Sequence, residues 1–346
     1  MTQIISKSRE YRRRRTTNPE NHLMRIPWHP LLWLVPLPFI AALSLLSGSS
    51  GFGWPDTATP TGRALLELRV CRLATGFIVG AALSCSGCAL QAVLRNALAE
   101  PFVLGVSSGG SLGAAIVIAF GLAATSPLIL PGGAFVAAAA TLLLVCSLAR
   151  RCSGYTPNTL ILTGVVVGSM LSSLLMLVLS FARTRAVHSI TWWLLGSLQS
   201  TSWPIIGSAA SLVVCAFAAL LAEARTLDAL SLGHETAHHL GVRTRVAVPV
   251  ILTAATLAAA CAVAISGIIG FVGLVVPHAL RRVAGASHRT LLPCAAIAGG
   301  AFLVLCDTLA RTATAPHEIP VGVITSLSGG PFFLYLLTRR GKLGEL

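Results

Sequence analysis

Long apolar runs recur along this chain, and they constrain its fold more than any other feature. A helix needs roughly 20 apolar residues to cross a bilayer core of about 30 Å. Only 10% of the residues are charged, whereas soluble domains carry about 25%. Candidate spans lie at about 28–47, 70–93, 101–121, 128–149, 156–181, 203–222, 246–266, 268–280, 291–310 and 320–338. The sequence therefore predicts an all-α polytopic membrane protein with about ten transmembrane helices.

Basic residues are distributed unevenly between the predicted loops. If residues 1–26 form a cytoplasmic tail and ten spans follow, most of the 25 Lys and Arg residues fall on the cytoplasmic side. We therefore expect 27–346 to form one transmembrane domain, with both termini cytoplasmic, in the cytoplasmic (inner) membrane of a bacterium. The net charge of +14 is then explained by topology and does not indicate nucleic-acid binding. The tail lacks a signal-peptide pattern, so the first span should be retained.

Small residues recur at helical spacing within the apolar runs. They let helix backbones approach closely in a membrane. We expect these glycines, together with Pro277 near a membrane face, to serve helix packing or gating. The residues are Gly105, Gly109, Gly113, Gly164 and Gly168.

Two features that the sequence lacks restrict which energy source could drive transport. The only lysines are Lys7 and Lys342, so the glycine-rich run 105–113 is not a Walker phosphate loop. We expect no catalytic residue, metal or cofactor in this chain, and ATP with Mg²⁺ only on separate ATPase subunits. All eleven acidic residues lie in tails, loops or span ends, which argues against an ion-coupled secondary transporter, although this alternative stays open.

The segment 223–245 is the one long polar interruption. It contains His234-Glu235-Thr236-Ala237-His238, which fits the H-E-x-x-H zinc-protease pattern. Thr244 stands where a longer form of the motif has a third histidine, and the motif lies among charged loop residues. A membrane zinc metalloprotease is therefore kept only as a remote alternative.

Three long blocks carry a family resemblance. They are LRVCRLATGFIVGAALSCSGCALQAVLRNALAEPFVLGVSSGGSLG, ISGIIGFVGLVVPHALRRVAGASHRTLLP and DTLARTATAPHEIPVGVITSLSGGPFFLYLL. Together they closely resemble FecCD-type permeases, the membrane subunits of importers for iron-siderophores, haem and vitamin B12. The chain departs from the family pattern at Cys71, Ala97 and Gly330, where the family usually has Pro, Pro and Ala.

The resemblance implies a ten-helix subunit of a dimeric translocation unit, either a homodimer or a pair of homologous permeases. It implies two cytoplasmic ABC ATPase subunits, an extracytoplasmic substrate-binding protein and surrounding membrane lipids as partners. The path would lie between the permeases, lined largely by the fifth span at about 156–180. Iron-siderophores are the family's most common cargo, and haem and cobalamin are alternatives. Neither the cargo nor a role for His188 or His317 follows from the sequence.

The resemblance also assigns site residues. We call 223–245 the coupling segment, because the family seats it in a cleft of the ATPase. Two short helices are expected at about 226–230 and 235–240, with a bend at Leu232-Gly233. The family's pattern matches Leu232, Gly233, Glu235, Ala237, Leu240 and Gly241. Docking of the binding protein is implied for Arg69, Arg72 and Arg311, and Trp192 and Trp193 are expected to be interfacial anchors.

Overall fold

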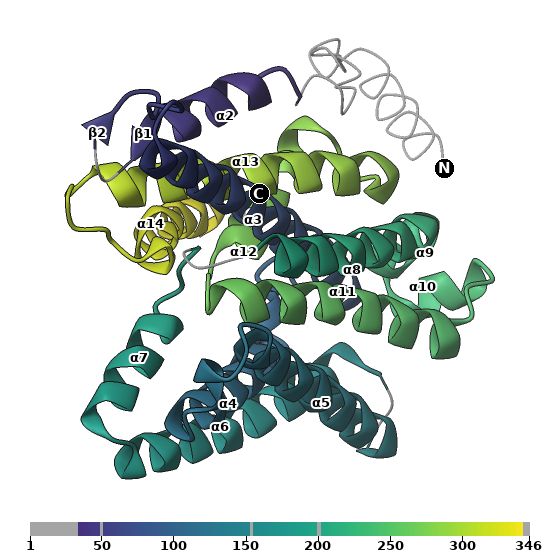
Figure 1. Cartoon of the computed structure of the whole chain (residues 1–346). Helices are drawn as coiled ribbons and strands as arrows, with labels where there is room; N and C mark the ends of the chain where they lie inside the picture. Colours follow the sequence, from purple (N-terminus) through teal and green to yellow (C-terminus); the bar gives the residue numbers. More distant parts are fainter. Residues whose placement is uncertain (1–33, 49–50, 153–154, 199–201, 342–346) are drawn as a thin grey trace, which may run out of the picture.

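The computed structural model describes residues 34–48, 51–152, 155–198 and 202–341, so the predicted basic tail at 1–26 lies outside the described residues. The described chain is a bundle of helices with one small hairpin (Figure 1). The first half contains α2 (Leu37–Leu46), β1 (Ser47–Gly48), β2 (Gly51–Phe52), α3 (Pro60–Val93), η3 (Pro101–Leu104), α4 (Val106–Ala119), η4 (Leu122–Ala124), α5 (Ile129–Cys152) and α6 (Pro157–Phe181). The second half contains α7 (Thr184–Leu194), α8 (Trp203–Ala222), α9 (Ala224–Leu232), α10 (His234–His239), α11 (Thr244–Ser266), α12 (Val272–Val283), α13 (His288–Thr312) and α14 (Val321–Gly341).

The predicted helical class is confirmed, and the helices agree in part with the ten predicted spans. Among the described residues, six helices are long and apolar enough to cross a membrane: α3, α5, α6, α8, α11 and α13. Shorter apolar helices occupy 37–46, 106–119 and 321–335. The short run at 268–280 overlaps α12, which has 12 residues and ends at Val283. Each predicted run therefore holds a helix, but several are shorter than a bilayer requires.

Helix starts follow local sequence signals. The Thr59 side chain accepts a hydrogen bond from the Gly62 amide, and Pro60 stands at the first helical position of α3. Thr156 and Pro157 form the same arrangement at the start of α6. A side-chain oxygen satisfies an amide without an intrahelical partner, and proline has no N–H to leave unsatisfied there.

Helix α3 is the central element of the bundle. It packs along α13, α11, α12 and α8, and most of its apolar window is buried. Its backbone lies directly against two neighbours: there is no room for a Cβ at Gly80 beside Gly299 of α13, or at Gly87 beside Gly273 of α12. The core of the molecule is therefore built around α3 by backbone contact as well as by side chains.

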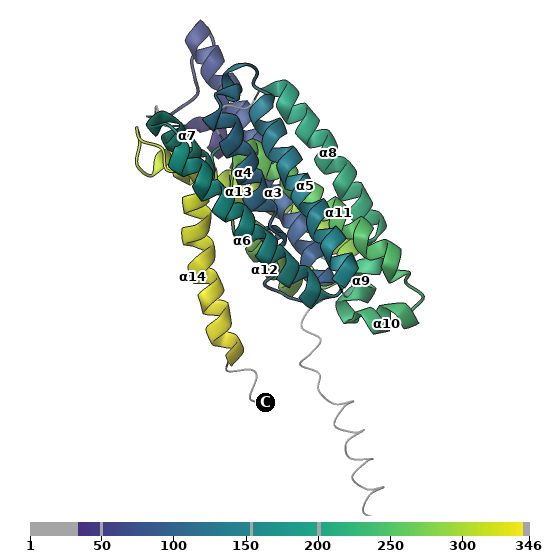
Figure 2. The same ribbon diagram turned by 90° about the horizontal axis from the view of Figure 1, so that it is seen from below.

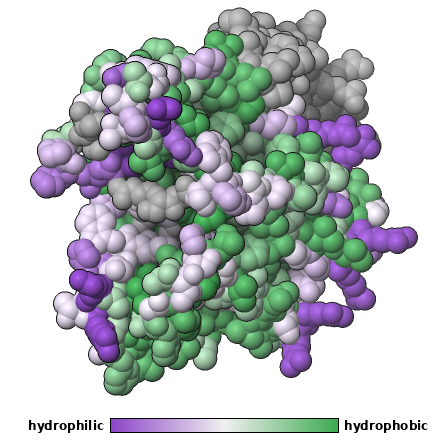
Figure 3. Space-filling view, in the orientation of Figure 1, coloured by the Kyte–Doolittle hydropathy of each residue, from purple (hydrophilic) through white to green (hydrophobic). Residues whose placement is uncertain are grey.

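Helices α5, α6 and α8 form the outer layer. Less than a third of the apolar window of each is buried in this single chain. Figure 3 shows hydrophobic surface over much of one face, with hydrophilic residues mainly at its margins. Such continuous apolar surface is expected where lipid or another membrane subunit surrounds the protein.

Candidate functional site: the coupling segment and the arginine cluster

The coupling segment forms two short helices at one end of the bundle. Helix α9 ends at Leu232, and α10 begins at His234, in agreement with the two helices expected from the sequence. Gly233 joins them with φ of 129°, a backbone conformation that side-chain-bearing residues rarely adopt. Figure 2 shows α9 and α10 at one end of the tilted bundle and α7 at the other.

One face of the coupling segment is anchored, and the other is open. Leu227, Leu230 and Ala237 are fully buried. Leu232 and Leu240 are 63% and 64% exposed, and Glu235 and Gly241 are also exposed. Apolar side chains that are exposed on a segment whose other face is anchored indicate a protein–protein contact.

The histidines of the coupling segment do not converge. His234 Nε2 lies 3.4 Å from the Val93 carbonyl oxygen, so its ring turns back toward α3. His238 and His239 are exposed and meet edge to face, with ring centroids 6.3 Å apart. Within the described ranges, no group of three or more His, Cys, Asp or Glu side chains is placed to hold a metal ion.

A cluster of charged residues lies at the opposite end of α3 and α13. We call Arg69, Arg72, Asp307, Arg311 and Glu318 the arginine cluster. Arg72 pairs with Asp307 at 2.9 Å and with Glu318 at 2.9 Å. Arg311 pairs with Asp307 at 3.1 Å, one helical turn away on α13. Charges removed from water require such partners.

The same cluster holds the N-terminal hairpin. Arg69 Nη1 donates to the carbonyl oxygens of Leu45 and Gly53, and Arg311 donates to those of Ser44 and Ser47. A Cβ at Gly48 would lie 2.6 Å from Arg69 Nη2, so a side chain at this position would displace the guanidinium group. The arginines fasten α2 and the hairpin onto α3 and α13. Figure 1 shows α2 and the hairpin at its upper left, near these two helices.

This placement differs from the exposed surface expected of docking residues. Arg69 and Arg311 are only 5% and 3% exposed, and the Arg72 side chain is 14% exposed. Their guanidinium groups are already engaged within the chain. The docking role itself stays a prediction, and sequence reasoning missed the internal partners Asp307 and Glu318. A carboxylate at the end of an apolar span is the signal that points to such pairing.

The glycines singled out from the sequence lie at close helix contacts. Gly105 has φ of 75° and packs against Gly164 and Gly168 of α6. A Cβ atom added to Gly105 would lie 3.4 Å from the Cα atom of Gly168. Gly109 and Gly113 face Thr141 and Gly133 of α5 without room for a Cβ. These glycines therefore lie where helices approach closely, and their gating role stays a prediction. Pro277 is buried within α12.

Glu100 was not singled out from the sequence, yet its carboxylate is largely enclosed. It accepts a hydrogen bond from the Phe271 amide at the start of α12. Burial raises the pKa of Glu100, and this hydrogen bond partly opposes the rise. Phe271 itself has φ of 68°. The carboxylate therefore supports an unfavourable backbone conformation at a helix N-terminus, where negative charge is favourable.

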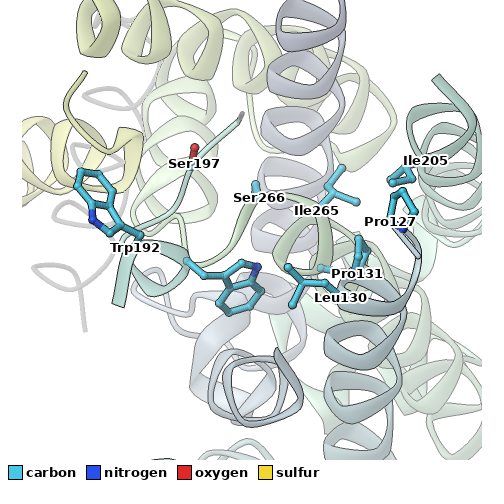
Figure 4. A pocket seen from close by; sticks show the side chains of 10 residues that line it. Pro127, Leu130, Pro131, Trp192, Ser197, Ile205, Ile265 and Ser266 are labelled. Carbon is cyan, nitrogen blue, oxygen red and sulfur yellow. The ribbon is translucent and has the colours of Figure 1, made fainter. Parts of the chain in front are cut away.

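A cavity of about 330 Å³ lies where α5, α7, α8 and α11 meet. Pro131, Ile265 and Ser266 are among its lining residues, with both tryptophans at 192 and 193 (Figure 4). His188 packs edge-on against Trp192, with ring centroids 6.1 Å apart. His188 and His317 are both exposed. This mixed apolar and hydroxyl lining carries no acid–base pair.

Comparisons with known proteins agree with this architecture. The chain is 41% identical over 309 residues to the cobalamin import system permease protein BtuC of Halobacterium salinarum, covering 88% of this chain and 80% of that protein. It is 39% identical to the hemin transport system permease protein HmuU of Yersinia pestis, covering 80% of this chain and 83% of that protein. It is 36% identical to the iron(3+)-hydroxamate import system permease protein FhuG of Bacillus subtilis, covering 80% of this chain and 83% of that protein.

A solved structure shares the fold. It is described as an inward-facing conformation of a metal-chelate type ABC transporter. The TM-score is 0.79 at 32% identity, covering 90% of this chain and 98% of that one. The FecCD transport family itself matches residues 36–339. With the helical bundle, the coupling segment and these relatives in agreement, the chain belongs to the FecCD transport family.

Proposed function

We infer that the chain is the multi-pass permease subunit of an ATP-driven importer in the bacterial cytoplasmic membrane. The observation that carries this inference is the coupling segment, which is anchored to the bundle by one face and exposes Leu232 and Leu240 on the other. Such a surface suits an ATPase subunit that hydrolyses ATP outside this chain. The permease itself provides a gated path and performs no covalent chemistry.

The proposed mechanism is mechanical. Closure of the paired ATPase subunits on ATP would tilt α9 and α10 together as a rigid unit, with their bend fixed at Gly233, the junction with φ of 129°. Tilting of an element packed on membrane helices exposes the path alternately to the two sides. The exposed residues Leu232, Glu235, Leu240 and Gly241 would contact the ATPase. Gly233 and Ala237 are buried and would hold the segment in its bent shape.

We propose that two permeases, either identical or homologous, form the path between their α6 helices. Helix α6 leaves Val165, Val166 and Met170 exposed in the single chain. The exposed Ser169 and Ser173 hydroxyls donate to carbonyls one turn back on α6, so they place no unsatisfied donor in the path. Ten spans and cytoplasmic termini complete this arrangement.

We propose that the arginine cluster forms the outer docking site for an acidic surface of the binding protein. The cluster has three guanidinium groups and two carboxylates, and Arg72 and Glu318 are its partly exposed members. Complementary charge steers the encounter and fixes register more than it adds affinity. Arg69 and Arg311 would act mainly by holding the hairpin in position beside Arg72.

The cargo class that we propose is a metal chelate, namely an iron-siderophore, haem or cobalamin. The relatives reported above are named for cobalamin, hemin and iron(3+)-hydroxamate, so they support the class and leave the member open.

Reconstitution tests this function. The permease, its ATPase subunits and its binding protein are placed in vesicles, and uptake of cyanocobalamin, haemin and a ferric hydroxamate is measured. We expect ATP-dependent uptake of one of them and none without the ATPases. Uptake driven by an ion gradient alone would overturn the proposal in favour of a secondary transporter. About one zinc per purified chain, with proteolysis lost in Glu235→Gln, would instead support the metalloprotease alternative.

A further inference from the structure

Asp228 of the coupling segment is bonded to the start of a distant membrane helix. Its Oδ1 accepts from the His288 amide at 2.8 Å and lies 2.6 Å from His288 Nδ1. Its Oδ2 accepts from the Ser287 hydroxyl at 3.4 Å. The carboxylate of α9 thus binds both the backbone and the side chain of the first residue of α13.

The arrangement supplies a helix cap from outside the helix. Ser287 occupies the N-cap position of α13, but its side chain makes no capping hydrogen bond. Amides in the first turn of a helix have no intrahelical partners, and the helix dipole favours a negative charge there. Asp228 provides both the acceptor and the charge, so the N-terminus of α13 is capped by a side chain of α9.

The histidine fixes the geometry of this contact. The His288 side chain is fully buried, whereas the Asp228 side chain is 37% exposed. An ionised carboxylate only accepts hydrogen bonds, so the 2.6 Å contact requires the proton on Nδ1. A buried ring held by a short charge-assisted hydrogen bond has little freedom to reorient.

Helix α13 continues from this contact to the arginine cluster. It has 25 residues and is therefore about 37 Å long. Asp307 and Arg311, near its last turn, are the groups that pair with Arg72 and hold the hairpin. Between the two ends α13 lies along α3, with Gly299 against Gly80. One continuous helix, with Pro293 inside it, therefore joins the coupling segment to the opposite end of the molecule.

We propose that Asp228 and His288 form a latch through which the coupling segment moves α13, and through α13 the arginine cluster. The two are positioning residues, because neither contacts ATP or cargo. This inference rests on the proposed importer function. It adds that docking outside and ATP hydrolysis inside are linked through the N-terminus of α13, in addition to any movement of α6.

The test uses the complete complex in lipid nanodiscs, with two ATPase subunits and cargo-free binding protein as the probe. ATP hydrolysis is measured with and without that protein. In Asp228→Ala and His288→Ala we expect its stimulation to fall at least about fivefold, while basal hydrolysis stays within about twofold of wild type, since loss of a two-state link changes coupling rather than either site. The double variant should be no worse than either single variant, because both remove one contact.

Thr290→Ala is the matched control. Its hydroxyl donates to the Ser287 carbonyl, so the change removes a hydrogen bond at the same helix end without touching α9, and stimulation should be unchanged. Asp228→Asn keeps an acceptor but removes the charge, and an intermediate loss is expected. If Asp228→Ala does not assemble with the ATPases, the double variant Asp228→Asn with His288→Ala replaces it. A loss of stimulation smaller than the sum of the two single losses supports the latch, and additive losses overturn it.

The outcomes separate the two proposals. A wild-type complex that neither hydrolyses ATP nor imports any of the three chelates would count against the importer function. An active wild-type complex in which Asp228→Ala and His288→Ala are stimulated like the control would overturn the latch alone. The latch would also fail if the active wild-type complex did not respond to the binding protein, because α13 would then have no signal to carry.

Discussion

The coupling segment and the arginine cluster are the two regions expected to meet partners, and they treat their key side chains in opposite ways. The coupling segment exposes Leu232 and Leu240 by 63% and 64%. The arginine cluster buries Arg69 and Arg311 and uses them to hold the hairpin through carbonyl oxygens.

The difference teaches that a residue pattern identifies a functional region more readily than it identifies the contacting atoms. Apolar side chains have few intramolecular uses at an exposed bend, so a leucine there is available to a partner. A guanidinium group at a span end has strong internal uses, since nearby carboxylates and carbonyls satisfy its donors.

The largest expected effect comes from breaking the arginine cluster. Asp307→Ala leaves Arg72 and Arg311 without their shared carboxylate, and removing one partner of a buried pair costs about 3–5 kcal/mol. Unfolding of the purified permease in detergent, followed by heat or denaturant, should show this loss of stability. Thr312→Ala removes an exposed hydroxyl one turn further along α13 and serves as the control. Equal stability of both variants would show that the cluster does not hold the fold.

A second change acts on the coupling segment. In Gly233→Pro, φ is restricted to about −65°, whereas Gly233 requires 129° and its amide donates to the Leu230 carbonyl. Cargo uptake should fall by about tenfold or more while ATP hydrolysis continues, because a changed bend would no longer pass the movement of the ATPase to the membrane helices. Ser231→Ala, an exposed position on α9 two residues before Gly233, should transport normally. Normal uptake by the proline variant would remove the bend from the mechanism.

The smallest effect concerns the exposed side of the cluster. Glu318 pairs with Arg72 at 2.9 Å and its side chain is 20% exposed, so it occupies a position that a partner's carboxylate would take. Glu318→Gln should tighten docking of the binding protein by about two- to fivefold, the range expected for a partly exposed ion pair. The gain should shrink as salt is raised.

Glu67→Gln is the matched control for that measurement, because Glu67 is an exposed carboxylate on α3 and its loss changes the net charge equally. Docking affinity can be measured as binding of the binding protein to permease nanodiscs immobilised on a sensor surface. If both variants tighten docking to the same degree, net charge alone explains the effect, and Arg72 has no particular role.

The helical class and the two short helices of the coupling segment could be predicted from the sequence for a clear reason. Apolar runs and the Leu-Gly punctuation at Leu232-Gly233 are local signals, and local signals survive without knowledge of the tertiary fold. The same holds for Gly105 and Gly168, whose small size already indicates close packing.

Other features depend on contacts between distant segments. Asp228 and His288 are 60 residues apart, and Arg72 and Asp307 are 235 apart, so no periodicity joins them. Helix α12 is also displaced from its apolar run, because residues 267–270 before it are not helical and the chain turns at Phe271. Pairing of this kind is a property of the folded bundle.

The glycine contacts of α3 have a consequence for where the molecule is able to deform. At Gly80 beside Gly299 and at Gly87 beside Gly273, main chain meets main chain with no side chain between them. Side chains absorb small shifts by changing rotamer, but peptide groups in contact have no such slack. Helices α3, α12 and α13 should therefore behave as one stiff block, and the shape changes of a transport cycle should be concentrated outside it, among helices such as α4, α5 and α6.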